Sequence, residues 1–223
     1  VLETIFETSS GAAALIDFMP IREPGQQIDV VRVVEGRKGR VPMRMEVTFR
    51  FDYGHVVPWV TSRDGALRAI AGPDAIKLRT PVAMHGEDFT TVADFSVQEG
   101  QQVPFTLTYF PSHLPEPGAR HPLHMLGETE SWWQEWSSRC TAEESPWHEA
   151  VIRSLITLKA LTYKPTGGIV AAATTSLPEQ LGGPRNWDYR FCWLRDSTFT
   201  LYALLIAGYT EEAHAWREWL LRA

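Results

Sequence analysis

The stretch MRMEVTFRF, residues 43–51, alternates apolar and polar side chains at every position. Its odd-numbered positions carry Met, Met, Val, Phe and Phe, whereas its even-numbered positions carry Arg, Glu, Thr and Arg. Because successive side chains of a β-strand point to opposite faces, this period of two predicts a strand with one buried and one solvated face. We therefore expect a sheet that covers a hydrophobic core in this part of the chain.

Further strands are predicted on both sides of this stretch. The period of two recurs in VPFTLTYF (103–110), and shorter candidates are AIKLRT (75–80) and FTTVADFSV (89–97). Residues 2–8 and 13–20 flank the sequence SSG, which predicts a hairpin with glycine in its turn. Many short strands punctuated by Gly and Pro are typical of an antiparallel β-sandwich, which we expect over residues 1–112, incomplete at its start.

The composition changes after residue 110. Residues 111–128, PSHLPEPGARHPLHMLGE, hold four prolines and two glycines, which predicts a linker. Residues 129–144 predict a short amphipathic helix. Two histidines, His121 and His124, have no cysteine partners or zinc-type spacing, and we interpret them as linker surface. We therefore expect a linker with a short helix over residues 113–144.

From residue 145 the hydrophobic period becomes helical. Ser145 is a candidate N-cap and Pro146 suits the first helical position. Apolar residues then recur at steps of three and four: Trp147, Val151, Leu155, Leu158 and Leu161. KPTGG (164–168) ends this helix, and two more helices are predicted at about 196–207 and 210–222. Strands followed by helices indicate two domains rather than an α/β sheet, with a helical domain over 145–223.

Charge and composition narrow the function classes. The net charge of −6 offers no basic surface for nucleic acid. No apolar run is long enough to span a bilayer, and no secretory signal opens the chain. The cysteines, Cys140 and Cys192, are interpreted as reduced thiols of a cytoplasmic protein, with a single bridge as the alternative. No motif for a metal or a phosphate is found, so we expect no cofactor.

The stretch NWDYRFCWLRD, residues 186–196, combines four large aromatic residues with two Arg and two Asp. A pocket that stacks on a polar ring and hydrogen-bonds its edge needs both kinds of side chain. Arg195 offers a planar set of five donors, and Asp196 can accept hydrogen bonds from paired hydroxyls. This stretch is therefore our candidate binding site.

Each of these residues also has a purely structural interpretation. Arg195 can form an ion pair with Asp188 or Asp196, and Asp196 can cap the helix that follows. The aromatic residues can be core side chains: Trp187, Tyr189 and Trp193.

Two other residues of this region, Glu179 and Cys192, are of types that can take part in catalysis. Glycoside hydrolysis needs a pair of carboxyl groups, and Glu179 in SLPEQ lies in the same loop. A lone loop glutamate is more often solvated or bonded to the backbone. Cys192 lies between Phe191 and Trp193, which favours a packed, inert thiol over a nucleophile.

The segment GGIVAAATTSLPEQLGGPRNWDYRFCWLRDSTFTLYALL, residues 167–205, resembles the opening of the catalytic domain of glycoside hydrolase family 15. That family contains glucoamylases, glucodextranases and bacterial trehalases, and the NWDYR-CWLRD form is most similar to its bacterial trehalase and glucoamylase-like branch. The strand region fits the family's N-terminal β-sandwich. The resemblance implies a β-sandwich, a helical linker and the first helices of an (α/α)6 barrel of six helical hairpins.

The resemblance also implies roles for individual residues. Arg195 and Asp196 match the pair that holds the hydroxyls of the non-reducing glucose. Trp193 matches an aromatic wall of that pocket, and Tyr189 matches a tyrosine near the scissile bond. The family's catalytic acid and base are glutamates on later loops, which Glu179 does not match. We therefore expect no catalytic residue in this chain, expect both downstream of Ala223, and interpret the chain as truncated.

The resulting hypothesis is an inverting, exo-acting α-glucoside hydrolase of trehalase or glucoamylase type that releases glucose from the non-reducing end of a disaccharide or small oligosaccharide. In this mechanism one carboxylic acid protonates the glycosidic oxygen and a carboxylate activates water on the opposite face. Two alternatives remain open. An α-glucoside phosphorylase would depend on phosphate, and a non-catalytic carbohydrate-binding fragment would bind sugar without hydrolysis.

Overall fold

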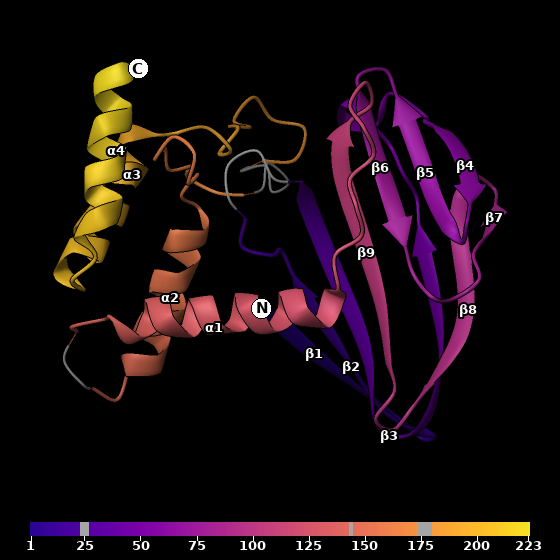
Figure 1. Cartoon of the computed structure of the whole chain (residues 1–223). Coiled ribbons are helices and arrows are strands. Elements are labelled where there is room, and N and C mark those ends of the chain that lie inside the picture. Colours follow the sequence, from indigo (N-terminus) through magenta and orange to yellow (C-terminus); the bar gives the residue numbers. More distant parts are fainter. Residues whose placement is uncertain (23–26, 143–144, 174–179) are drawn as a thin grey trace. The chain divides into compact units, whose positions relative to one another are not determined.

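The computed structural model of the 223-residue chain divides into two compact units, Val1–Ser131 and Trp132–Ala223. Four ranges are described: residues 1–22, 27–142, 145–173 and 180–223. Strands come first and helices follow, as the change of hydrophobic period predicts. Figure 1 shows the elements of each unit. In the described parts of the chain no helix combines the length and apolar character needed to cross a membrane.

The first unit is built from antiparallel strands. Its described strands are β1 (Leu2–Thr8), β2 (Gly11–Phe18), β3 (Ile28–Val47), β4 (Trp59–Arg63), β5 (Ala66–Ala71), β6 (Asp74–Arg79), β7 (His85–Glu87), β8 (Thr90–Gln98) and β9 (Gln102–Pro111). Hydrogen bonds connect them in the order β1-β2-β3-β9-β6-β5-β4, and β8 joins β3 and carries β7 at its other edge. The antiparallel β-structure expected from the sequence is therefore confirmed.

The strands form two groups, β1-β2-β3-β9-β6-β5-β4 and β3-β8-β7, and β3 belongs to both. Its first half, residues 28–35, pairs with β9, and its second half, residues 40–47, pairs with β8 (Figure 1). The main core contains side chains from both groups, among them Leu67 of β5, Leu78 of β6 and Val97 of β8. The strands therefore enclose this core from two sides.

The alternation in residues 43–51 has the predicted consequence. Phe49 is buried, and Met43, Met45, Val47 and Phe51 pack against the same core. The hairpin around Gly11 is also confirmed, because β1 and β2 pair along their whole length. The sequence pattern missed the first half of β3, which precedes the charged run EGRKGR.

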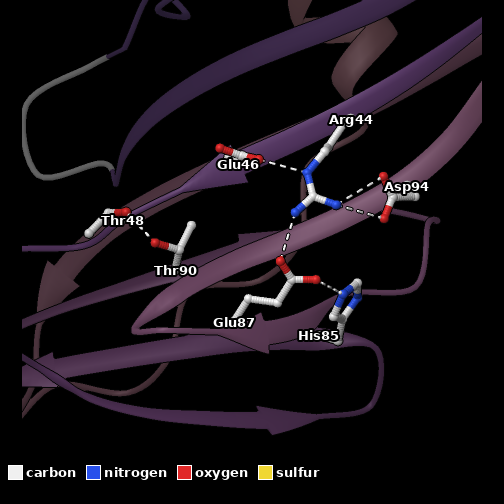
Figure 2. Close-up of polar contacts among 7 residues, drawn as sticks. All are labelled: Arg44, Glu46, Thr48, His85, Glu87, Thr90 and Asp94. Carbon is white, nitrogen blue, oxygen red and sulfur yellow. Dashed lines mark hydrogen bonds and ion pairs between the residues drawn. The ribbon is translucent and has the colours of Figure 1, made fainter.

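Arg44 and Glu46, near the end of β3, lie on a polar face (Figure 2). Arg44 donates to Glu46 at 2.6 Å, Glu87 at 2.7 Å and Asp94 at 3.1 Å, so one guanidinium contacts three carboxylates. Hydrogen bonds from His85 and from Arg44 lower the pKa of Glu87. All these groups are solvent-exposed, so the cluster orders the surface but contributes little to the free energy of folding.

The predicted linker is partly wrong. Helix α1 spans Pro122–Ser138 and thus begins seven residues before the expected start at 129. Its first turn is fixed by the buried side chain of Met125, which packs against Phe18, Val31 and Val33 of the sheet. The start of this helix was not predicted, because the prolines and glycines around it are typical of an irregular linker. Proline is nevertheless well tolerated in the first turn of a helix.

The residues before α1 are attached to the sheet. Arg79 donates to the carbonyl oxygen of Pro117 at 2.7 Å, and Lys77 forms an ion pair with Glu116. The division of the chain into residues 1–112, 113–144 and 145–223 stays a prediction.

The second unit contains α2 (His148–Ala160), α3 (Leu194–Ile206) and α4 (Thr210–Arg222), together with the end of α1. The three predicted helices are confirmed, with a shift at the start of α2. Trp147 is its N-cap residue, and Ser145 forms a preceding turn in which its hydroxyl oxygen accepts a hydrogen bond from the Trp147 N–H at 3.2 Å.

A buried carboxylate joins three helices of this unit. Glu212 in the first turn of α4 is 4% exposed, and its Oε1 accepts hydrogen bonds from Lys159 Nζ of α2 at 2.7 Å and from Trp136 Nε1 of α1 at 3.0 Å. The Trp136 ring stacks on Tyr209 with 4.1 Å between centroids, and the Tyr209 hydroxyl donates to the Trp136 carbonyl oxygen at 3.1 Å. These contacts connect α1, α2 and α4 through one buried carboxylate and one stacked ring pair.

The protonation states match these hydrogen bonds. Burial is the largest influence on Glu212 and opposes its charge, but the bonds from Lys159 and Trp136 together outweigh burial and lower its pKa. Burial raises the pKa of Tyr209 to about 12, so its hydroxyl remains a donor at neutral pH. Glu212 is therefore an ionised acceptor and Tyr209 a neutral donor.

Replacing Glu212 by Gln should destabilise the chain by about 3 kcal/mol, because it leaves the partly buried ammonium of Lys159 without its charged partner. Urea unfolding followed by circular dichroism at neutral pH measures this loss. Glu211→Gln, in the same turn but exposed, is the matched control and should change the unfolding free energy by less than about 0.5 kcal/mol. Equal effects of the two variants would contradict the assignment.

Glu212 also predicts a dependence of stability on pH. Its pKa in the folded state lies below its ordinary value of 4.5, so its contribution is fully present above that value and is lost as pH falls through the lower, folded-state pKa. The stability difference between the wild type and Glu212→Gln should therefore shrink on acidification below about pH 4.5. Thermal unfolding of both proteins across that range measures the difference.

Helix α3 exposes large apolar side chains, and such patches promote association. The exposed residues are Phe199, Tyr202, Leu205 and Ile206. We expect the isolated 223-residue chain to self-associate in a concentration-dependent manner, as sedimentation velocity measures. Phe199→Lys combined with Ile206→Lys should reduce this association, whereas Thr198→Lys, an exposed polar position on the same helix, should not. A monodisperse monomer at high concentration would contradict this prediction.

Candidate functional site

The candidate site lies on the segment between α2 and α3. After α2 the chain turns back at Gly167, whose φ is 85° and where a Cβ atom would lie 2.3 Å from the carbonyl oxygen of Ala215. Only glycine fits this position. The N–H groups of Ala171 and Ala172 then donate to the carbonyl oxygens of Phe191 at 3.0 Å and Tyr189 at 2.8 Å. Two parts of the loop that are far apart in sequence are thereby held side by side.

Asp188 organises the turn that carries the aromatic residues. Its Oδ1 accepts hydrogen bonds from the backbone N–H of Arg190 at 2.9 Å and from Arg190 Nε at 3.1 Å. These bonds from Arg190 lower the pKa of Asp188. Its carbonyl oxygen accepts a hydrogen bond from Trp193 Nε1 at 3.1 Å. One residue thus fixes both the turn and the indole ring of Trp193.

Trp193 lies between the other two aromatic rings of the site. Its centroid lies 5.9 Å from that of Tyr189 and 6.3 Å from that of Trp187. Trp187 is half exposed, and Tyr189 and Trp193 are partly exposed. The three rings pack against one another and still retain accessible surface.

Arg195 and Asp196 follow directly, in the first turn of α3. Arg195 Nη2 lies 3.2 Å from Asp196 Oδ2, and the two side chains are 71% and 29% exposed. The ion pair with Asp196 that the sequence offered as an alternative is present, whereas Asp188 is paired with Arg190 instead. The capping role of Asp196 is wrong, because the N-cap residue is Trp193. A carboxylate in the first turn is nevertheless favoured by the helix dipole.

Ser197 was not identified from the sequence. Its side chain is buried, and its hydroxyl lies 3.2 Å from the sulfur of Cys192 and donates to the carbonyl oxygen of Ile169 at 3.4 Å. Ser197 therefore joins the start of α3 to the returning loop. Cys192 is partly buried and contacts Ser197, in agreement with a packed thiol, and both cysteines are free. A serine beside an aspartate in a first turn is too common to reveal this role.

Other charged and metal-ligating residues singled out from the sequence lie in different places. Glu179 lies outside the described residues. His124 is in α1 rather than in a linker, 3.5 Å from Glu128. Within the described ranges, no group of three His, Cys, Asp or Glu side chains could hold a metal ion. The site thus consists of an exposed guanidinium–carboxylate pair and, a few residues earlier in the sequence, partly exposed aromatic rings. These groups suit hydrogen bonding to hydroxyls and stacking on a ring.

Comparison with known proteins places this segment in a family. Residues 146–223 match the model of glycosyl hydrolases family 15. The chain is similar to trehalase of Mycobacterium tuberculosis, with 35% identity over 82% of this chain and 28% of the relative. It is also similar to trehalases of Mycolicibacterium smegmatis and Thermoplasma acidophilum, with 32% and 33% identity over 96% and 88% of this chain and 36% and 34% of those relatives. The chain thus spans about a third of the length of these relatives.

Asp188→Ala should loosen the loop, because it removes the hydrogen bonds between the Asp188 carboxylate and Arg190. We expect the amide of Ala172, which donates to Tyr189, to exchange with solvent at least ten times faster, a change of about 1.4 kcal/mol in local stability. Hydrogen exchange measured by NMR tests this. Arg185→Ala, an exposed position outside this bonding pattern, is the control and should leave the rate unchanged.

Proposed function

Residues 146–223 belong to glycosyl hydrolase family 15, and from this premise we propose that the chain supplies the glucose-binding part of an α-glucoside hydrolase of trehalase type. The proposal assigns the hydroxyl edge of the non-reducing glucose to Arg195 and Asp196. It assigns an aromatic wall to Trp193 and a position near the scissile bond to Tyr189.

The observation that carries the proposal is the exposed Arg195–Asp196 pair at the start of α3. A sugar hydroxyl is both donor and acceptor, so neighbouring hydroxyls can bond to a guanidinium and a carboxylate at the same time. The pair is already formed, so little side-chain ordering remains for the ligand to impose. Accessible aromatic rings nearby in the sequence offer apolar faces of the kind on which sugar rings stack.

The proposed reaction is hydrolysis with inversion at the anomeric carbon. A carboxylic acid protonates the glycosidic oxygen, and a carboxylate removes a proton from the water that attacks from the opposite face. We assign neither role to a described residue of this chain. The role of these residues is to hold the glucose ring while its hydroxyl contacts tighten towards the oxocarbenium-like transition state. Trehalose is the proposed substrate because the relatives named above are trehalases.

Asp196→Asn should weaken the binding of trehalose by about 10- to 150-fold, since hydrogen bonds to a charged group contribute roughly 1.5–3 kcal/mol. Isothermal titration calorimetry on the 223-residue chain measures the affinity, and a thermal melt establishes that the fold survives. Glu218→Gln, which removes a partly exposed carboxylate on α4, is the control for a lost surface charge. Unchanged affinity in Asp196→Asn would remove this residue from the site.

The reaction itself is tested on the protein in its natural length. Proton NMR of the glucose freshly released from trehalose should show equal amounts of the β- and α-anomers. Water attack inverts one anomeric carbon to β, whereas the leaving glucose keeps its α-configuration. Release of only the α-anomer, or a requirement for inorganic phosphate, would contradict the proposed hydrolysis with inversion. The 223-residue chain alone should bind trehalose and release no glucose.

A further inference from the structure

A second candidate site lies in the first unit. A hollow of about 320 Å³ is formed by the residues just after β3, by the start of β4 and by the β7–β8 hairpin. Its lining includes Phe49, Arg50, Trp59, Phe89 and Thr90. This volume is at the lower end of the range of ligand pockets and suits one or two small rings. Trp59 is 74% exposed and Phe89 is 82% exposed, so both rings offer surface to a ligand.

Phe89 occupies a strained backbone position. Asp88 and Phe89 form the two-residue turn between the paired residues Glu87 and Thr90, with φ values of 44° and 62°. Such a turn favours Asn or Asp followed by Gly, because both central residues need a positive φ. The chain uses that favoured form between β4 and β5, where Asp64 and Gly65 have φ values of 53° and 72°.

The contrast between the two turns points to a role for the Phe89 ring. A bulky residue with positive φ is disfavoured, and a side chain that is mostly exposed gains little packing energy to offset this strain. Glycine would satisfy the turn better, as it does at position 65. The aromatic side chain is therefore explained by a contact with something outside the described fold.

Polar groups in the lining of the hollow can form hydrogen bonds to a ligand. Within the described residues the guanidinium of Arg50 makes one hydrogen bond, from Nη1 to the carbonyl oxygen of Phe49 at 2.7 Å, out of five possible donors. The hydroxyl of Thr90 lies 2.9 Å from that of Thr48 and can also bond to a ligand (Figure 2). Two rings with a few fixed donors and a hydroxyl suit a ring-shaped polyol.

The neighbouring charge selects a neutral ligand. Gly86, which lines the hollow, lies in β7 between His85 and Glu87 of the polar cluster in Figure 2. The three carboxylates and one guanidinium of that cluster together carry a net charge of −2. A second anion close by would be repelled, whereas an uncharged ligand would not.

We propose that this hollow binds a neutral saccharide ring through Trp59, Phe89 and Arg50, independently of the Arg195–Asp196 site. The unit that carries it would then contribute a second sugar contact to the protein. Binding at such a shallow site is expected to be weak, in the millimolar range.

The test uses the 223-residue chain carrying Asp196→Asn, so that the first site is weakened and any binding that depends on Trp59 and Phe89 comes from the hollow. Maltotriose is titrated and followed by saturation-transfer NMR. Trp59→Ala and Phe89→Gly should each weaken binding at least tenfold, whereas Phe6→Ala, an exposed aromatic position on β1 outside the lining, should not. Phe89→Gly should at the same time raise the melting temperature, because glycine relieves the positive φ. Damage to the fold cannot produce weaker binding together with a higher melting temperature.

Several results would overturn the proposal. These are the absence of maltotriose binding to the Asp196→Asn chain, binding that survives both aromatic substitutions, or tighter binding of an anionic sugar such as glucuronate. Sedimentation velocity tests one more alternative. If Trp59→Ala abolishes self-association and leaves sugar binding intact, the hollow contacts a second copy of this chain instead of a sugar. The first site is judged separately, by the effect of Asp196→Asn on trehalose binding to the otherwise wild-type chain.

Discussion

The close approach of the β3 backbone to its neighbours at Gly36 is the constraint on which the first unit depends. A Cβ atom at Gly36 would lie 1.9 Å from the carbonyl oxygen of Gln98, so no other residue fits without moving the backbone. This contact occurs where β3 leaves its pairing with β9 and begins its pairing with β8. One continuous strand can therefore pair with both groups of strands. As a consequence it contributes Val34 and Val41 to the core between them.

The sequence predicts the elements of this chain better than their connections. Strands with one buried face, such as residues 43–47, are visible because burial of one face imposes the period of two. The first half of β3 was missed, because Val30, Val31, Val33 and Val34 do not keep that period and a charged run follows. The start of α1 was missed because its stability comes from Met125 against the sheet, a tertiary contact that overrides the local prolines.

The same distinction applies to the candidate site. The residue types of NWDYRFCWLRD indicate stacking and hydrogen bonding, so Arg195, Asp196 and the aromatic rings could be named from the sequence. The pairing of Asp188 with Arg190, and the attachment of Ser197 to Ile169, could not, because they depend on how the loop folds back on itself. Sequence chemistry identifies the groups that can contact a ligand, whereas the groups that hold them in place require coordinates.

Solvent exposure distinguishes the charged side chains that stabilise the fold from those that can bind a ligand. Asp29 and Glu212 are buried, and each accepts hydrogen bonds from two other side chains, Thr108 and Gln27 in one case and Lys159 and Trp136 in the other. Such carboxylates have a structural role, because a buried oxygen that loses its hydrogen-bond partner destabilises the fold. The Arg195–Asp196 pair is different, since Arg195 is largely exposed and its contribution to stability is small. A ligand can therefore add hydrogen bonds to this pair without dismantling the fold, which is the physical condition for a binding site at the start of α3.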